Sequence, residues 1–132
     1  MTDRRDVLVV DDEPVVNAAV RLVLEHEGMA VTTVPDAETA LAHPDLDRFR
    51  LVICDLMLPG KSGLEVLSAL RARRPMVPIV MITGYATPAH EDQVLAAGAT
   101  AFLAKPFDED ELVTLVRQVL AQAGNADEER NP

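Results

Sequence analysis

The sequence contains no tryptophan, one tyrosine and one cysteine in 132 residues. A single cysteine excludes a disulfide within the chain, and Cys54 lies in the apolar run 51–54, where we expect a buried, unreactive thiol. Long apolar runs are also missing near the start, because the run 7–10 is interrupted by two aspartates and is too short for a signal peptide or a membrane span. These absences indicate a reducing compartment, and we expect a cytoplasmic protein.

Basic residues are scarce as well. Twelve lysines and arginines stand against 22 aspartates and glutamates, which gives a net charge of −10. A charge of this sign repels nucleic acid and anionic lipid. The densest basic stretch contains Arg71, Arg73 and Arg74, and we interpret it as a solvated helix end. We therefore expect this domain to bind neither nucleic acid nor membranes directly.

Apolar residues, in contrast, make up 48% of the chain and follow two alternating patterns. Short runs rich in Val, Ile and Leu predict strands, and stretches with apolar residues three and four positions apart predict helices. The expected strands are 7–10, 30–34, 51–54, 79–82 and 101–103. The expected helices run from Pro14 to just before Gly28, over 36–41, 63–73 and 88–97, and from Asp108 to Gly124.

This strict alternation of strand and helix predicts an α/β fold, with one open parallel sheet covered by helices on both faces. Strands buried on both faces are apolar at every position, as most of these are. The length fits a single domain with a hydrophobic core. We place that domain over residues 1–123 and interpret 124–132, which is polar and lacks apolar periodicity, as a disordered tail.

Three aspartates directly follow predicted strands. Asp11 and Asp12 come after the first strand, and Asp55 comes after the third. In a doubly wound, flavodoxin-like sheet of order 2-1-3-4-5 these two strands are neighbours, and ligands bind at their carboxyl ends. Close carboxylates repel one another unless a cation offsets their charge, which favours Mg²⁺. An alternative is that Asp12 or Glu13 only caps the helix that begins after them.

Two further strand ends carry groups that would complement such a site. Thr83 follows the fourth strand with a hydroxyl, and Lys105 follows the fifth with an ammonium group. A carboxylate nucleophile, a metal, an ammonium and a hydroxyl are the groups that phosphoryl transfer uses. Taken alone, Thr83 fits a helix boundary and Lys105 a surface charge. Lysine is scarce here, with Lys61 as the only other one, and this favours a specific role for Lys105.

Four sequence runs resemble a known family when they are taken together. They are VLVVDDEP at 7–14, VICDLMLPG at 52–60 with Ser62 and Gly63, ITGY at 82–85, and AGATAFLAKPF at 97–107. In this order and at this spacing they resemble the response-regulator receiver domains of two-component signalling. The resemblance spans about residues 6–122.

The resemblance implies a phosphorylation switch. Asp55 would accept a phosphoryl group from the phosphohistidine of a sensor histidine kinase, from a phosphotransfer protein, or from a small donor such as acetyl phosphate. Mg²⁺ or Mn²⁺ would be held by the carboxylates of Asp12 and Asp55, by Asp11 directly or through water, and by the backbone carbonyl of Met57. The domain would catalyse only its own phosphorylation and slow dephosphorylation, so we expect no enzyme with a separate substrate.

The resemblance also implies how a signal would leave the site. Thr83 and Lys105 would contact the phosphoryl group, and the peptide bond from Lys105 to Pro106 would be cis. Phosphorylation would draw Thr83 inward and let Phe102 turn toward the interior, although plain core packing of Phe102 is the alternative. The face made by the fourth helix, fifth strand and fifth helix would then act on an unidentified output partner or on a second copy of the chain. Tyr85 is placed to affect access to the phosphoryl group.

Two other functions fit parts of the pattern. A phosphatase of the haloacid dehalogenase type also uses an aspartate after a parallel strand together with Mg²⁺. Its motif has a second aspartate two residues later, where this chain has Met57. A receiver fold that serves as a phosphate-independent interaction module is the other alternative, and it would have no need of Asp12, Asp55, Thr83 and Lys105.

Overall fold

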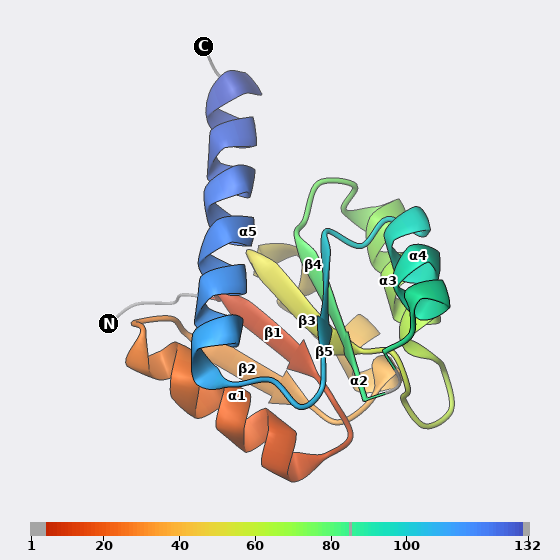
Figure 1. The fold of residues 1–132 in the computed structure, drawn as a ribbon. Helices are drawn as coiled ribbons and strands as arrows, with labels where there is room; N and C mark the ends of the chain where they lie inside the picture. Colours follow the sequence, from red (N-terminus) through yellow and green to blue (C-terminus); the bar gives the residue numbers. More distant parts are fainter. Residues whose placement is uncertain (1–4, 85, 131–132) are drawn as a thin grey trace.

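The computed structural model describes residues 5–84 and 86–130, with side chains described as far as residue 123. It contains a five-stranded parallel sheet of order β2-β1-β3-β4-β5 (Figure 1). The strands are β1 (Val7–Val10), β2 (Val31–Val34), β3 (Leu51–Asp55), β4 (Ile79–Thr83) and β5 (Ala101–Ala104). The predicted α/β class and strand order are confirmed, and each predicted strand boundary lies within one residue of the observed one.

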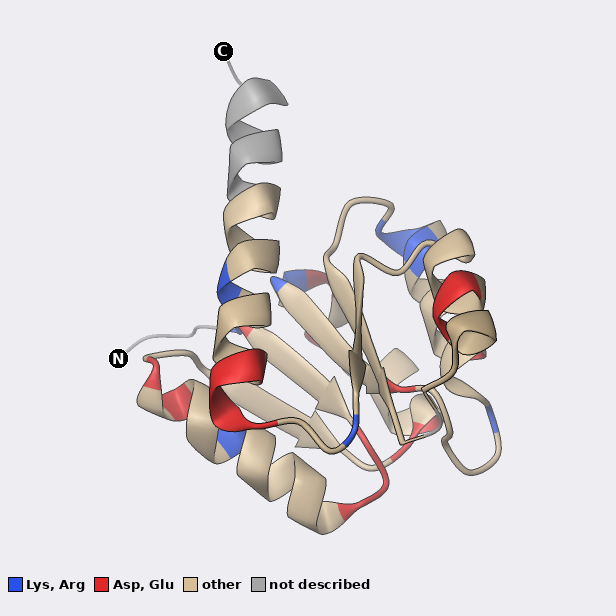
Figure 2. Cartoon of the chain, viewed as in Figure 1, with Lys and Arg blue, Asp and Glu red and all other residues tan. Residues whose placement is uncertain are grey.

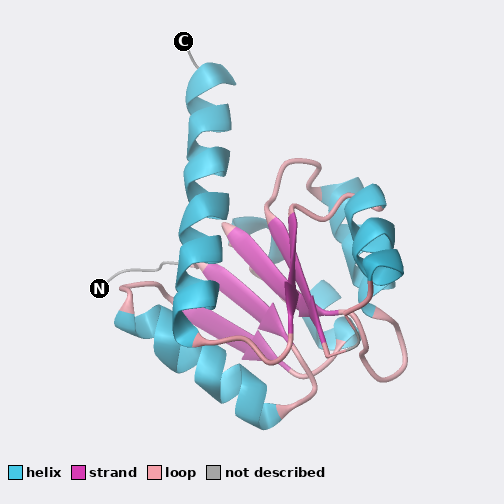
Figure 3. Cartoon of the chain, viewed as in Figure 1, coloured by secondary structure: helices cyan, strands magenta, loops and turns pink. Residues whose placement is uncertain are grey.

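Helices connect the strands and cover both faces of the sheet (Figure 3). The helices are α1 (Pro14–His26), α2 (Ala37–Leu41), α3 (Gly63–Arg73), α4 (Pro88–Ala96) and α5 (Glu109–Arg130). A 3₁₀ helix at Leu46–Arg48, too short to show apolar periodicity, was not predicted. Helices α1 and α5 lie on one face of the sheet, and α2, α3 and α4 lie on the other (Figure 1).

Local sequence signals account for most helix ends. Asp108 Oδ1 accepts a hydrogen bond of 2.7 Å from Glu111 N, while Glu111 Oε1 accepts one of 3.4 Å from Asp108 N, which makes a reciprocal capping box. Thr87 Oγ1 accepts a hydrogen bond of 3.2 Å from His90 N and caps the start of α4. After α1, Gly28 adopts a φ of 87°, a backbone conformation that ends a helix and favours glycine.

The end of α5 differs from the prediction. Gly124 was expected to terminate this helix, but α5 continues to Arg130. A glycine inside a helix costs only about 1 kcal/mol relative to alanine, and alanine and glutamate, both good helix formers, follow it. The placement of a domain boundary at residue 123 stays a prediction.

The arginines at the end of α3 also differ from the prediction. Arg71 donates to the carbonyl oxygens of Val77 at 2.6 Å and Gly98 at 2.9 Å, and Arg74 donates to that of Leu46 at 3.1 Å. A guanidinium offers five donors and can satisfy several loop carbonyls at once. The interpretation as a solvated helix end is therefore wrong for Arg71 and Arg74, which tie the helix end to neighbouring loops.

Two apolar layers enclose the sheet, because successive side chains of each strand point to opposite faces. Val7 and Val9 pack in the layer under α1 and α5, and Leu8 and Val10 pack in the layer under α2, α3 and α4. Every residue of β1, β3 and β4 is buried. Close packing on both faces fixes the position of the strand ends, where the polar residues lie.

Cys54 is fully buried in this core, as its apolar surroundings predicted. Burial raises the pKa of its thiol far above the ordinary value, and the nearby Asp55 and Asp11 charges add to the effect. The thiol is therefore protonated and unreactive. Among the described residues, no helix has the length and apolar character needed to cross a membrane.

Candidate functional site

Three aspartates lie together at the carboxyl edge of the sheet. Asp11 and Asp12 follow β1, and Asp55 is the last residue of β3. These two strands pair in register, so that one carboxylate oxygen from each aspartate lies within 4.8 Å of those of the other two. Asp11 and Asp55 are buried, and Asp12 is exposed. The structure thus brings the three residues into one cluster that opens to solvent on one side.

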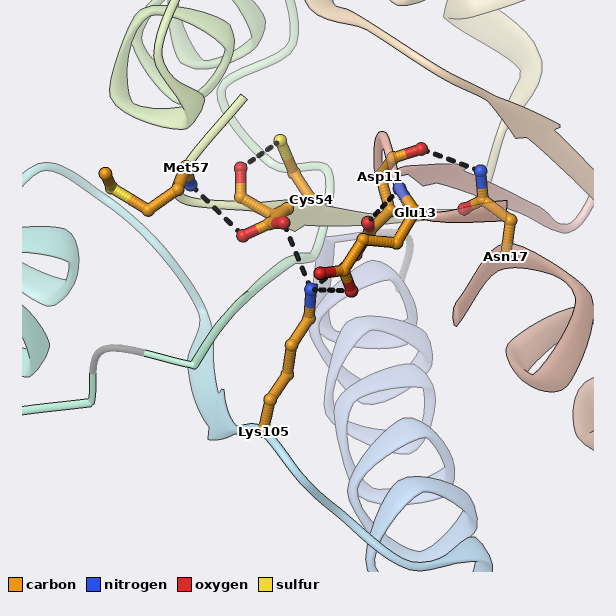
Figure 4. A network of polar contacts seen from close by, with 7 residues as sticks. Asp11, Glu13, Asn17, Cys54, Met57 and Lys105 are labelled. Atoms are coloured by element: carbon orange, nitrogen blue, oxygen red, sulfur yellow. Dashed lines mark hydrogen bonds and ion pairs between the residues drawn. The ribbon is translucent and has the colours of Figure 1, made fainter. Parts of the chain in front are cut away.

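Backbone amides and one side chain hold this cluster in place (Figure 4). Asp11 Oδ1 accepts a hydrogen bond of 2.8 Å from Glu13 N, and Asp55 Oδ1 accepts one of 3.1 Å from Met57 N. Asn17 Nδ2 donates to the backbone oxygen of Asp11 at 2.7 Å. This role of Asn17 could not be predicted, because a polar residue in the first turn of a helix has no distinctive pattern.

These contacts also decide how α1 begins. Glu13 is the N-cap residue, but its side chain makes no capping hydrogen bond. Asp11 already accepts the Glu13 amide, and Pro14 occupies the first turn and has no amide to cap. The alternative in which the side chain of Asp12 or Glu13 only caps α1 is therefore wrong, and both carboxylates remain available for other contacts.

Lys105 brings a positive charge into the cluster from the end of β5. Its Nζ lies 2.9 Å from Asp11 Oδ2, 3.1 Å from Asp55 Oδ2 and 3.2 Å from Glu13 Oε2 (Figure 4). The backbone fixes its position, since Lys105 N donates to Thr83 O at 2.8 Å. The Lys105–Pro106 peptide bond is cis. Figure 2 shows the same arrangement at the level of the fold, with acidic residues on the loop after β1 and a basic residue where β5 ends.

The ionisation of this site is perturbed in both directions. Burial raises the pKa of Asp55, and the Met57 amide and the Lys105 ammonium only partly offset the rise. Burial would lower the pKa of Lys105, but its contacts with Asp11 and Asp55 outweigh this and raise the pKa well above its ordinary value. Lys105 is therefore charged at neutral pH and neutralises only part of the surrounding negative charge.

A cleft of about 490 Å³ opens above the cluster. It is lined by Asp12, Glu13, Asp55, Met57, Thr83, Gly84 and Lys105. Thr83 is the buried last residue of β4, whereas the side chain of Met57 is exposed. Candidate residues at the carboxyl ends of β1, β3, β4 and β5 therefore border one cleft large enough for a small anionic group: Asp12, Asp55, Thr83 and Lys105.

Phe102, which was predicted to take part in switching, lies away from this cleft. Phe102 is half-buried on the edge strand β5 and packs against the core layer under α3 and α4. It borders a separate shallow depression between β5 and α5. Whether it turns inward stays a prediction. Tyr85 lies outside the described residues.

The donor set fits a hard divalent cation. It consists of carboxylate oxygens, which Mg²⁺ prefers, and the ligand atoms are close enough to share one ion. Asp11 Oδ2 is buried, and among the described residues it has no hydrogen-bond donor of acceptable geometry, although Lys105 lies near it as an ion-pair partner. A buried carboxylate oxygen in this situation is stabilised by a cation.

Asp55→Asn is expected to raise the free energy of unfolding near neutral pH in metal-free buffer. Because burial raises the Asp55 pKa in the folded protein, the folded state binds more protons than the unfolded state above the ordinary value of 3.8. The free energy of unfolding of wild type should thus fall as the pH rises above 3.8 toward the raised pKa of Asp55. The variant has no carboxyl group at this position and should lack this decrease. Urea unfolding at several pH values measures it, and equal slopes for the two proteins would contradict the prediction.

Comparison with known proteins identifies the family of this chain. A family model described as the response regulator receiver domain matches residues 7–117. The probable transcriptional regulatory protein TcrX of Mycobacterium tuberculosis is 41% identical over 120 residues, covering 89% of this chain and 50% of TcrX. The transcriptional regulatory protein CseB of Streptomyces coelicolor is 36% identical over 126 residues, covering 96% of this chain and 53% of CseB. The chain spans about half the length of these relatives.

Solved structures give the same result. A receiver domain protein from Methanospirillum hungatei matches with a TM-score of 0.87 and 29% identity, over 94% of this chain and 99% of that one. The receiver domain of NtrX from Brucella abortus matches with a TM-score of 0.82 and 35% identity, over 88% of this chain and 98% of that one. The haloacid dehalogenase alternative is not favoured by these matches. The chain belongs to the response regulator receiver domains of two-component signal transduction.

Proposed function

We propose that this domain is switched by phosphorylation of Asp55 in the presence of Mg²⁺. The observation that carries the proposal is the convergence of Asp55 with Asp11, Asp12 and Lys105 at one edge of the sheet, beside a cleft. Asp12 and Asp55 of the acidic cluster both border the cleft, and Asp55 is the one that also contacts Lys105. A donor phosphoryl group in that cleft would meet a nucleophile, a cation and a hydroxyl together.

The reaction is a transfer of one phosphoryl group to a carboxylate. An oxygen of Asp55 attacks the phosphorus of the donor and forms an acyl phosphate. The bond that breaks is the P–N bond of a phosphohistidine, which releases imidazole, or the P–O bond of acetyl phosphate, which releases acetate. Burial raises the pKa of Asp55, and a cation bound beside this carboxylate would lower that pKa and favour the ionised nucleophile.

Asp11, Asp12, Asp55 and the backbone carbonyl of Met57 are the proposed metal ligands. When bound, Mg²⁺ would offset the negative charge of both the aspartates and the phosphoryl oxygens. Mn²⁺ is an acceptable substitute because it takes the same oxygen ligands. Lys105 would then contact a phosphoryl oxygen as a point charge, and the Thr83 hydroxyl would donate to another.

We propose that phosphorylation changes the face formed by α4, β5 and α5, and that this face contacts the target of the switch. Thr83 and Phe102 would link the site to this face, since they lie on β4 and on the adjacent β5. Its target would be an effector, a partner protein or a second copy of the chain. The proposed phosphoryl donor is a sensor histidine kinase or phosphotransfer protein in the cytoplasm. The receiver would occupy residues 1–123, with residues 124–132 outside it.

Acetyl phosphate and Mg²⁺ together are expected to add one phosphoryl group to the protein. The reason is that the cleft can hold a small donor beside Asp55 without help from a kinase. Intact-protein mass spectrometry measures the product, and EDTA should abolish it because Mg²⁺ is then removed. An unmodified mass under these conditions would overturn the proposal.

The same reaction separates the receiver from a phosphatase. A receiver should accept the group in proportion to protein and release it slowly, without turnover of general phosphate esters. Sustained hydrolysis of p-nitrophenyl phosphate with many turnovers per protein would instead favour an enzyme. If neither modification nor turnover occurs although Mg²⁺ binds, the fold serves as a phosphate-independent module.

A further inference from the structure

The ammonium group of Lys105 contacts two of the three aspartates that would hold a metal ion. Its Nζ lies 2.9 Å from Asp11 Oδ2 and 3.1 Å from Asp55 Oδ2, on residues of the proposed metal cluster. A divalent ion bound to the same carboxylate groups would lie close to this ammonium group. The two positive charges would repel each other strongly, particularly where burial excludes water. Binding of the metal therefore requires Lys105 to move away from at least one aspartate.

A third carboxylate already contacts Lys105 on the outer side of the cluster. Glu13 Oε2 accepts a hydrogen bond of 3.2 Å from Lys105 Nζ. The side chain of Glu13 is 59% exposed, whereas those of Asp11 and Asp55 are 0% and 6% exposed. Glu13 also stands outside the three-aspartate cluster and on the rim of the cleft. Lys105 can thus move outward while keeping one negatively charged partner.

Helix capping does not account for the position of the Glu13 carboxylate. Its side chain makes no capping hydrogen bond, and its backbone amide is bound to Asp11 Oδ1. The negative charge near the start of α1 would be favourable for the helix in any orientation of the side chain. The contact with Lys105, in contrast, depends on the full length of the glutamate and on its direction toward the cleft.

We propose that Glu13 is a positioning residue for Lys105, which holds the ammonium group at the rim of the cleft when Mg²⁺ takes Asp11 and Asp55. In this role Glu13 makes metal binding more favourable without being a metal ligand. It also keeps Lys105 beside the place where a phosphoryl group would arrive. The inference rests on the proposed function, because it requires the aspartate cluster to bind a metal.

Glu13→Gln is expected to weaken Mg²⁺ binding about threefold to fivefold, which is the scale of one partly exposed ion pair. Isothermal titration calorimetry of the whole chain with MgCl₂, without any phosphoryl donor, measures this effect directly. Glu109→Gln is the matched control, because it removes the same charge from an exposed position in the first turn of α5. The control should leave the dissociation constant nearly unchanged.

A double-mutant cycle with Lys105→Met distinguishes positioning from a diffuse charge effect. If Glu13 acts through Lys105, Lys105→Met alone should tighten Mg²⁺ binding, and adding Glu13→Gln should then change the affinity no more than Glu109→Gln does. An equal effect of Glu13→Gln with and without Lys105 would overturn the inference.

Glu13→Asp gives an independent test that needs no change at Lys105. It keeps the charge but shortens the side chain, so we expect Mg²⁺ affinity close to that of Glu13→Gln. Affinity equal to wild type would contradict the positioning role. If wild type itself fails to bind Mg²⁺, the proposed metal site is wrong, and this inference is wrong with it. If wild type binds Mg²⁺ and the Glu13→Gln variant binds it with the same affinity, only this inference is overturned.

Discussion

Asp55→Asn is expected to remain entirely unmodified after incubation with acetyl phosphate and Mg²⁺, under conditions that add one phosphoryl group to wild type. An amide oxygen is a far weaker nucleophile than a carboxylate, and it cannot form the acyl phosphate that the proposed reaction requires. The substitution keeps the size and shape of the side chain, which is buried at the end of β3. The loss should therefore be complete without unfolding of the domain.

The control for this result is Asp110→Asn, a change of the same kind on the exposed surface of α5. It should be modified to the same extent as wild type. Borohydride reduction of the modified wild-type protein followed by peptide mass mapping should place the group on Asp55 rather than on Asp11 or Asp12. Modification of the Asp55→Asn variant, or mapping to another residue, would show that Asp55 is not the acceptor.

Gly63→Ala is expected to lower the free energy of unfolding by about 3 kcal/mol or more, at the upper end of what overpacking costs. Gly63 begins α3, and its amide donates to Leu56 O at 2.9 Å, so the helix starts directly against the end of β3. A Cβ atom there would collide with the carbonyl oxygen of Asp55 and lie 2.7 Å from Leu56 Cα. Backbone atoms cannot rotate away as a flexible side chain can.

Thermal unfolding measures this effect, and a decrease of about 10 °C or more in Tm is expected for a domain of this size. Gly84→Ala is the matched control, because a Cβ atom at Gly84 would meet no atom within 4 Å. That variant should stay within about 1 kcal/mol of wild type. Similar Tm values for the two variants would contradict the steric argument.

Most of the fold could be predicted because its signals are local. Apolar runs and helical periodicity located β1, α3 and the start of α1 without error. The last helix was misjudged at Gly124, since one unfavourable residue does not outweigh favourable neighbours on both sides. The arginines Arg71 and Arg74 were misinterpreted because they bind carbonyl groups of segments far away along the chain, at Gly98 and Leu46.

The candidate site could be located from strand ends alone, but its contacts could not. The position of Asp11, Asp12 and Asp55 after two adjacent strands was enough to expect a cluster. Nothing in the sequence indicated that Asn17 would hold the backbone of Asp11. The direction of a side chain depends on the packing around it, which local sequence does not specify.

By itself, the sequence of this protein determined the alternation of strands and helices, and with it the edge of the sheet at which the aspartates, Thr83 and Lys105 lie. Only the tertiary structure decided that Lys105 sits among Asp11, Asp55 and Glu13, the last of them 92 residues away along the chain. The physical reason is that elements form from periodic patterns over a few residues, whereas ion pairs form between whichever side chains the folded sheet brings within about 4 Å.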